Sequence, residues 1–236
     1  MRTNQMPRES RAMTRFEVLV IAGVIALLTM VVLPGVANTS NRYGRLACLN
    51  NLRQIGVAFH SWGNDRGDFV PLRTPMKDGG LGKNSSGGLL NPRAGSAWFD
   101  FAYMSNQLGA PNILICPSDT AKAPNQCSTW RDLFVRQNAA VSYFVCCEAF
   151  PNKPQAILAG DRNLQSDALG NCDVGISGIW QANANSGSRS GWTNIMHFPM
   201  GNLLLNDGQV AETSTDTMHW YLGLTTFSGA VHCVMP

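Results

Sequence analysis

A long apolar segment near the N-terminus dominates the hydrophobic pattern of this 236-residue chain. It runs from Val18 to Ala37, and Thr29 is its only polar side chain. As a helix rising about 1.5 Å per residue it would extend roughly 30 Å, enough to cross the hydrocarbon core of a bilayer. We therefore expect a membrane-spanning helix, with the basic flank before it in the cytoplasm and the remaining chain exported.

A second periodic pattern follows this segment. Apolar side chains recur every three or four positions from Leu46 to Trp62, with Arg, Asn and Gln between them. This spacing predicts an amphipathic helix whose apolar stripe packs on a core. Because residues 63–68 are rich in helix breakers, the helix is expected to end near Trp62.

Shorter patterns in the rest of the chain predict a mixed head. Strands are expected at 113–116, 140–146 and 156–159, and in a hairpin whose strands, 202–205 and 209–211, flank Asn206-Asp207-Gly208. Short helices are expected at 97–108 and 130–136, exposed loops at 78–88 and 185–191, and either a closing strand or a frayed tail at 220–236. The predicted fold class is α+β, with the long helix packed across an antiparallel sheet.

A single carboxylate stands at the start of the apolar segment. Glu17 directly precedes Val18, and a charge at the mouth of a membrane-length helix is costly without a partner. One interpretation is a carboxylate that simply reaches the lipid headgroups. The other is a contact with a positive charge on a neighbouring helix.

The N-terminus resembles that of type IV pilins and type II secretion pseudopilins. That family has a short basic leader, a prepilin peptidase site, an apolar helix, and a glutamate near the start of the mature chain. Aligning Glu17 with that glutamate places the cut between Ala12 and Met13, with Met13 as the N-methylated first residue. Pro34 then falls where the family commonly has a helix-kinking proline. The family usually has glycine before the cut, where this chain has alanine.

The resemblance implies an organisation and a set of partners. Residues 1–12 would be the leader, 13–63 the transmembrane and amphipathic helix, and 64–236 the exported head. The partners would be prepilin peptidase, the inner membrane, and copies of the chain or other pilins. Glu17 of one subunit would then meet the new amino group of Met13 on its neighbour, neutralising two charges in an apolar bundle. The chain would wait in the inner membrane, with its N-terminus cytoplasmic, before entering a periplasmic or extracellular filament.

A narrower resemblance involves both ends of the chain. The segment 48–56 is similar to the post-membrane region of large pilin-like proteins of Planctomycetes and Verrucomicrobia, which carry a C-terminal motif of His, nine residues, then Asp-Gly. Here that motif is His197, Asp207 and Gly208. Its Asp-Gly pair is explained by a hairpin turn, and a lone His-Asp pair offers too few ligands for a metal. We assign the motif a structural role and no catalytic one.

The cysteine content indicates an oxidising compartment. The chain has seven cysteines without zinc-finger spacing, and the odd number leaves at least one outside intramolecular disulfides. Adjacent Cys146 and Cys147 would point to opposite faces of a strand, so they should not bond to each other. The disulfide candidates in the head are Cys116, Cys127, Cys146, Cys147, Cys172 and Cys233. A small buried apolar side chain is the alternative role for each.

Charge and motifs exclude several functional classes. Charged residues make up 14% of the chain and the net charge is +3, which argues against a nucleic-acid platform. The sequence contains no nucleophile elbow, zincin motif or phosphate loop, so we predict no enzyme and no cofactor. Calcium stays open because pseudopilin heads can bind it; the candidate carboxylates are Asp65, Asp68, Asp119 and Asp161.

Three functional hypotheses follow. The first is a structural subunit of a type IV pilus or of a type II secretion pseudopilus-like filament. The second is a membrane-tethered extracytoplasmic binding module that does not polymerise. The third is a secreted hydrolase or sugar-binding domain, because residues 35–37 have the small-x-small form that signal peptidase cleaves, here after Ala37.

Overall fold

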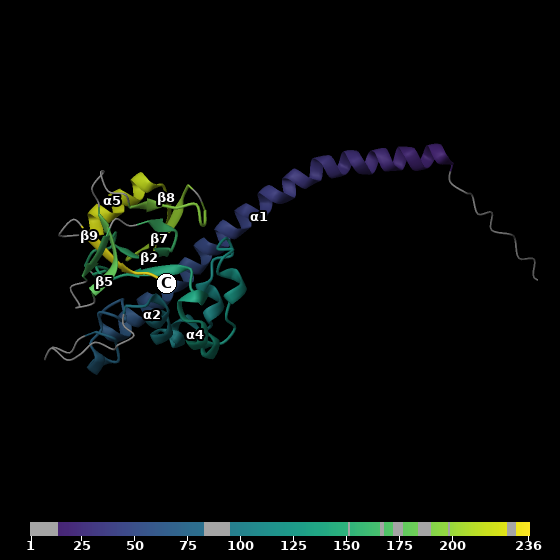
Figure 1. Cartoon of the computed structure of the whole chain (residues 1–236). Coiled ribbons are helices and arrows are strands. Elements are labelled where there is room, and N and C mark those ends of the chain that lie inside the picture. Colours follow the sequence, from purple (N-terminus) through teal and green to yellow (C-terminus); the bar gives the residue numbers. More distant parts are fainter. Residues whose placement is uncertain are drawn as a thin grey trace, which may run out of the picture. The chain divides into compact units, whose positions relative to one another are not determined.

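The protein is described here from a computed structural model covering residues 14–82, 95–150, 152–165, 168–171, 177–183, 190–197, 199–225 and 230–236; the side chains of 31–42, 168, 177–179, 183 and 230 are not included in the description. The chain forms two compact units, Met1–Tyr43 and Gly44–Pro236. One helix, α1 (Arg15–Arg66), contributes to both units and is 52 residues long (Figure 1).

The second unit, which we call the head, is a mixed α+β fold. Its other helices are α2 (Ala97–Tyr103), α3 (Ser105–Leu108), α4 (Trp130–Arg136) and α5 (Thr215–Thr225), with 3₁₀ turns η1 (Met76–Asp78), η2 (Pro111–Leu114), η3 (Ala123–Asn125) and η4 (Gln137–Ala140). Its strands are β1 (Tyr143–Cys146), β2 (Ile157–Asp161), β3 (Leu164–Gln165), β4 (Ala168–Asn171), β5 (Ser177–Asn183), β6 (Gly191–Trp192), β7 (Gly201–Leu205), β8 (Val210–Thr213) and β9 (Ala230–Val234).

Seven of the strands form one sheet in the order β4-β5-β9-β1-β2-β7-β8. Every neighbouring pair is antiparallel, which confirms the predicted α+β class with an antiparallel sheet. β3 and β6 form a separate two-stranded ribbon. The last strand, β9, lies inside the sheet, because it pairs with β1 on one side and with β5 on the other.

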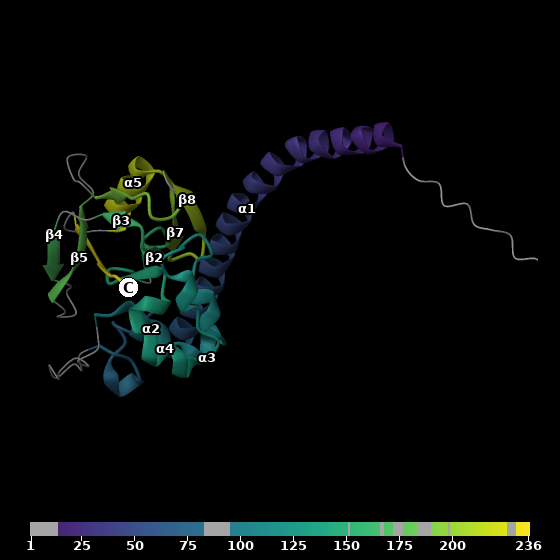
Figure 2. The same ribbon diagram turned by 45° about the vertical axis from the view of Figure 1, so that its right-hand side comes forward.

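The sheet has an apolar core on each face because side chains alternate along a strand. In β1, Tyr143 and Val145 belong to the cluster that contains the head portion of α1 and helix α2. Phe144 and Cys146 belong to the cluster that contains α5. In both views α5 lies on the opposite side of the sheet from α2 and α4 (Figures 1 and 2). The head therefore has helices on both faces of a central sheet.

The amphipathic stripe of α1 is confirmed from Leu52 onward. Leu52, Ile55, Phe59 and Trp62 are buried in the core that also contains α2, whereas Leu49 is half-buried and Leu46 is exposed. The helix continues past the predicted end to Arg66, so Gly63 and its polar neighbours form its last turn. It stops at Gly67, whose φ of 80° is left-handed and whose N–H donates to the carbonyl of Gly63.

The hairpin of β7 and β8 lies along α1. The guanidinium of Arg45 donates to Glu212 near the open end of the hairpin and to the carbonyl of His197 just before β7. In the middle, a Cβ at Gly56 would stand 2.8 Å from Cδ1 of Leu204, and at the turn a Cβ at Gly208 would stand 3.3 Å from Nε2 of His60. We call these three contact points, at Arg45, Gly56 and His60, the seam. From Arg45 to His60 along α1, the contacted residues also increase in number along the hairpin, from His197 to Gly208, so β7 and α1 point in the same direction.

The close approach at the seam predicts that Gly56→Val destabilises the head. The added isopropyl group has to displace the wholly buried Leu204 side chain, and overpacking of this kind typically costs about 1–3 kcal/mol. Thermal and urea denaturation of the full chain in mild detergent measures the loss. Gly23→Val is the matched control, because a Cβ at Gly23 meets nothing within 4 Å. Equal stability of the two variants would contradict the close approach.

The predicted hairpin turn is confirmed, with one backbone detail corrected. The N–H of Gly208 donates to Leu205 and the N–H of Leu205 donates to Gln209. Within the described turn only Gly208 has positive φ, at 84°, whereas we expected both residues of the Asp-Gly pair to adopt it. The pattern is a type I turn followed by a left-handed glycine, the usual three-residue hairpin loop.

Other predicted elements shift or change type. The strand at 113–116 is wrong: Pro111 starts the 3₁₀ turn η2, because its fixed φ suits a first turn and it has no N–H to offer a ladder. The strand at 140–146 shortens to β1, the one at 156–159 becomes β2, and the helix at 97–108 breaks at Met104 into α2 and α3. Helix α4 has the predicted bounds 130–136.

The segments predicted as loops or tail are more ordered than expected. In the predicted exposed loop 78–88, Asp78 and Gly79 are exposed as predicted, residues 80–82 are buried with Leu81 in the core, and 83–88 lies outside the described residues. Of the predicted loop 185–191, residues 185–189 lie outside the description and Ser190 is buried. The segment 220–236 contains the end of α5 and the central strand β9.

The predicted membrane span overlaps the first half of α1. Among the described residues, no helix combines the length and the apolar character needed to cross a membrane. The predicted span, Val18–Ala37, extends from residue 31 onward into the part of α1 whose side chains are not described. The span therefore stays a prediction.

A buried carboxylate on α2 predicts a pH effect on the stability of the head. Burial raises the pKa of Asp100 from 3.8 to about 7, against a weaker opposing hydrogen bond from the backbone of Leu72. The folded state therefore holds the proton of Asp100 more tightly than the unfolded state does. The resulting contribution to the free energy of unfolding is complete below pH 3.8 and is lost as the pH rises through about 7. Asp100→Asn should reduce this loss, which urea midpoints at pH 4.5 and 7.5 measure, and the buried Asp161, whose pKa is also raised to about 7, should account for a loss that remains. An undiminished loss in Asp100→Asn would contradict the raised pKa of Asp100.

Candidate functional site

The most concentrated polar chemistry in the described part of the head surrounds His197. This residue is buried and has a φ of 47°, which is unusual for a residue with a side chain. Its carbonyl accepts hydrogen bonds from the N–H of Met200 and from the guanidinium of Arg45, so its backbone is held from two directions. The left-handed conformation turns the chain into β7 and leaves the imidazole inside the head.

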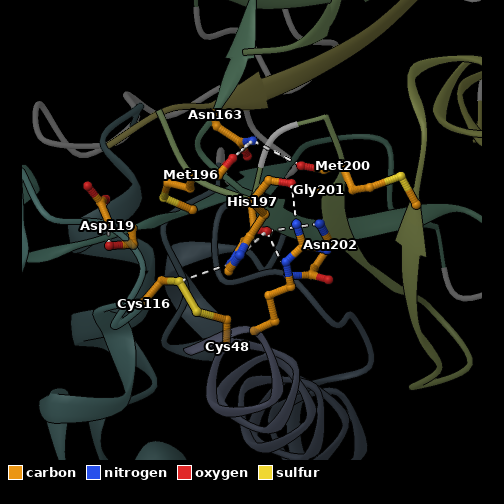
Figure 3. A network of polar contacts seen from close by, with 12 residues as sticks. Cys48, Cys116, Asp119, Asn163, Met196, His197, Met200, Gly201 and Asn202 are labelled. Carbon is orange, nitrogen blue, oxygen red and sulfur yellow. Dashed lines mark hydrogen bonds and ion pairs between the residues drawn. A yellow bond between two sulfur atoms is a disulfide. The ribbon is translucent and has the colours of Figure 1, made fainter. Parts of the chain in front are cut away.

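A disulfide lies directly against the imidazole. Cys48 on α1 and Cys116, just after η2, are bonded to each other and both are fully buried. The Nε2 atom of His197 is 3.2 Å from Sγ of Cys116. Figure 3 shows the ring directed toward this disulfide. Three segments that are far apart in the sequence therefore meet at one point.

A buried carboxylate approaches the same nitrogen. Asp161, the last residue of β2, has an Oδ2 that lies 3.8 Å from Nε2 of His197 and accepts hydrogen bonds from the backbone N–H (2.9 Å) and side-chain amide (2.8 Å) of Asn202. Burial raises the pKa of Asp161 to about 7, although both hydrogen bonds oppose the shift. Its Oδ1 has no hydrogen-bond partner among the described residues.

The imidazole of His197 is neutral at physiological pH. Burial lowers its pKa to about 4, and the positive charge of Arg45 adds to the shift. A neutral imidazole has one nitrogen with a free lone pair, which can act as a base or as a metal ligand. The contact with Asp161 is therefore not an ion pair at neutral pH.

The geometry does not fit a Cys-His-Asp catalytic triad. A triad needs the nucleophile on one ring nitrogen and the carboxylate on the other. Here Cys116 and Asp161 both approach Nε2, and the sulfur is bonded to Cys48. The arrangement is instead a convergence of sulfur, nitrogen and oxygen atoms on one buried point.

A second polar cluster anchors the neighbouring loops. The carboxylate of Asp119 accepts hydrogen bonds from Nε (2.6 Å) and Nη2 (2.7 Å) of Arg162 and from the hydroxyl of Ser142 (2.8 Å). Burial would raise the pKa of Asp119, but the hydrogen bonds from Arg162 and Ser142 lower it below its ordinary value. This fully buried charge is therefore paired, and it joins the segment after η2 to one end of the β1–β2 pair, where the start of β1 lies beside the end of β2.

The two parts of the His-x9-Asp-Gly motif occupy opposite ends of β7. His197 precedes the strand and enters the buried cluster. Asp207 follows the strand, is exposed, and caps the turn by accepting the N–H of Gln209. Gly208 supplies the left-handed turn conformation beside His60. The motif therefore marks the two ends of the strand that lies along the seam.

The predicted calcium carboxylates do not gather in one place. Asp119 is paired with Arg162, Asp161 is hydrogen-bonded to Asn202, and Asp68 is paired with Arg73. Within the described residues, the group of three or more His, Cys, Asp and Glu side chains that lie close enough to share an ion consists of Cys48, Cys116 and His197. None of the four candidate aspartates belongs to it.

Some of the cysteines predicted as disulfide candidates are bonded in the structure and others are not. Cys116 is bonded to Cys48, which we did not include among the candidates, and Cys146 is bonded to Cys233 across β1 and β9. Cys146 and Cys147 contribute to opposite faces of the sheet, as predicted. Cys127 is buried outside any disulfide of the described residues, and Cys172 lies outside the description. The buried stripe of α1 contains Cys48 and was the signal that could have placed it in the head.

The processing and assembly residues are only partly described. Ala12 and Met13 lie outside the described residues, and Pro34 lies within α1 where side chains are not described. Glu17 is in the first turn of α1, where Thr14 and Glu17 form a capping box: the backbone N–H of Thr14 donates to the carboxylate at 2.8 Å, and the N–H of Glu17 donates to the hydroxyl of Thr14 at 3.3 Å. The carboxylate therefore has a local structural partner that sequence reasoning missed.

Comparison with known proteins adds no family to these observations. No protein-family model matches the chain, and neither the curated proteins nor the solved structures give a significant match.

Proposed function

We propose that this protein is a structural subunit, a pilin or pseudopilin, of a type IV pilus or type II secretion pseudopilus-like filament. The observation that carries the proposal is the outer surface of α1 between residues 14 and 30. Its large apolar side chains are exposed throughout, from Phe16 (75%) to Met30 (77%). An apolar surface of this extent requires a cover, which a bilayer provides before assembly and neighbouring helices provide afterwards.

The head supports an extracytoplasmic location. Its described residues form two disulfides, and each connects segments that are distant in the sequence. Such bonds form and persist where thiols are oxidised, as in the periplasm or outside the cell. In the proposal the chain is held in the inner membrane with its N-terminus in the cytoplasm, and its partners are prepilin peptidase and other subunits.

The mass of the native protein tests the processing step. Intact-mass analysis of protein purified from its own membrane should find a chain that begins at Met13 and carries one added methyl group. A chain that keeps residues 1–12 would favour a tethered module that does not polymerise. A chain that begins at Asn38 would mean release after Ala37 as a secreted domain, and would overturn the proposal.

A matched pair of variants tests the assembly role of Glu17. Glu17→Ala removes both the carboxylate and the capping box, whereas Thr14→Ala removes the hydroxyl of the capping box and keeps the charge. If Glu17 neutralises an amino group on a neighbour, Glu17→Ala should abolish crosslinked multimers in membranes while Thr14→Ala retains them. Equal loss in both variants would assign Glu17 to helix capping alone, and unchanged multimers in both would exclude the assembly contact.

A further inference from the structure

The atoms around Nε2 of His197 form a set of metal-ligand types. The Sγ atoms of Cys48 and Cys116 and a ring nitrogen of His197 all lie within 4.8 Å of one another, and all three residues are buried. They come from α1, from the segment after η2, and from the turn before β7. In the oxidised protein the two sulfurs are bonded to each other and cannot act as thiolate ligands.

Asp161, on a fourth segment, is the carboxylate beside this set, although its oxygens do not lie within 4.8 Å of all three ligand atoms. Its Oδ2 is 3.8 Å from Nε2 of His197, and its Oδ1 has no hydrogen-bond partner among the described residues although the side chain is fully buried. In a tetrahedral zinc site, bonds of about 2.0–2.3 Å place neighbouring ligand atoms roughly 3.3–3.8 Å apart. The separations from Nε2, 3.2 Å to sulfur and 3.8 Å to oxygen, are close to that range.

We propose that reduction of the Cys48–Cys116 disulfide converts this cluster into a binding site for Zn²⁺ or a similar borderline-soft divalent ion. The ligands would be the two thiolates and Nε2 of His197, and a shift of the neighbouring Asp161 side chain toward the sulfurs would bring in its carboxylate as the fourth. Two thiolates and a neutral imidazole are ligands that zinc favours, and the deep burial disfavours the harder, more strongly hydrated Mg²⁺ and Ca²⁺. Disulfide and metal exclude each other because they use the same two sulfur atoms.

The conversion balances with a phosphine as the reductant. The phosphine breaks the S–S bond and becomes a phosphine oxide with the oxygen of one water, whose two hydrogens leave both cysteines as thiols. Each thiol then loses its proton when the ion binds, so metal binding releases two protons and is weaker at low pH. Two thiolates cancel the charge of the divalent ion.

In the reduced head, the bound metal ion would replace the Cys48–Cys116 disulfide as the link between distant segments. The disulfide joins α1 to the segment after η2, and the metal would join these two segments and add β2 and the start of β7. A head that has not yet been oxidised would thereby keep the same segments together. The inference does not depend on the proposed function, because it concerns only side chains inside the head.

Cobalt binding tests the site in the full chain. The protein in mild detergent is reduced with a phosphine, freed of reductant without oxygen, and titrated with Co²⁺ as the spectroscopic probe. We expect one equivalent to give intense visible bands of tetrahedral coordination and a thiolate-to-cobalt charge-transfer band, both removed by Zn²⁺. The oxidised protein should give neither. Equal binding before and after reduction would overturn the proposal.

Variants assign the signal to this cluster. Cys48→Ser/Cys116→Ser should abolish the charge-transfer band, whereas Cys146→Ser/Cys233→Ser, which removes the other disulfide, should keep it. His197→Ala should lower the affinity by about tenfold or more. Mapping of the Cys48–Cys116 disulfide after reoxidation shows whether His197→Ala still folds. Full-affinity binding in His197→Ala, or binding lost only with the Cys146–Cys233 pair, would place the ion on other thiols and overturn the proposal.

Discussion

Replacing both Cys48 and Cys116 with serine is expected to lower the free energy of unfolding of the oxidised head by about 4 kcal/mol. The bond closes a loop with a sequence separation of 68 residues, and chain-entropy reasoning assigns a loss of that size to opening it. Urea denaturation of the full chain in mild detergent, under oxidising conditions, measures the difference. The two buried serines would add a smaller loss of their own, since their hydroxyl groups have to find hydrogen-bond partners.

Cys127→Ser is the matched control for this loss. Cys127 is as buried as the bonded pair but forms no disulfide within the described residues, and its thiol is close to the carbonyl of Asn125, which a serine hydroxyl could also use. We expect this variant to stay close to the parent protein. If the double variant loses no more stability than Cys127→Ser, the disulfide contributes little to the folded head.

Removing the positive charge of Arg162 should destabilise the head by about 3–5 kcal/mol. Arg162→Met leaves the fully buried carboxylate of Asp119 without its bidentate partner, and a lone buried charge is far more costly than a missing pair. The measurement is the shift of the urea midpoint at pH 7. Glu212→Gln, which breaks the half-exposed pair with Arg45, should cost only about 0–1 kcal/mol.

A double-mutant cycle separates the ion pair from the packing around it. Adding Asp119→Asn to Arg162→Met removes the stranded charge, so the double variant should lose less stability than the two single losses combined. The coupling should fall within about 0.5–3 kcal/mol. Strict additivity would mean that Asp119 and Arg162 act independently, against the hydrogen bonds seen between them.

The elements that sequence reasoning located carry their signals locally. The Asp-Gly turn, the strand around Val145 and the helix at 130–136 each combine periodicity with turn or capping residues within a few positions. Thr129, for example, accepts the N–H of Asp132 at the start of α4. The apolar stripe of α1 was visible for the same reason, since each buried residue is three or four positions from the next.

What sequence reasoning missed depends on contacts between distant segments. His197 meets Cys116, which is 81 positions away, and Asp161 meets Asn202 across 41 positions. Nothing local distinguishes Asp161 or Arg162 from a solvent-exposed charge until β2 is placed inside the sheet. The strand β9 was left open between a strand and a tail, because a short apolar segment without a clear period does not distinguish the two.

The seam determines how the head would respond to a pulling force applied at the N-terminal end of α1. Because β7 runs with α1, tension along the helix would load the contacts at Arg45, Gly56 and His60 together, in shear, instead of peeling them apart one at a time. The Cys48–Cys116 bond lies at the end of this seam that the tension would reach first. The disulfide would therefore bear the load first, and the seam contacts behind it would have to break cooperatively.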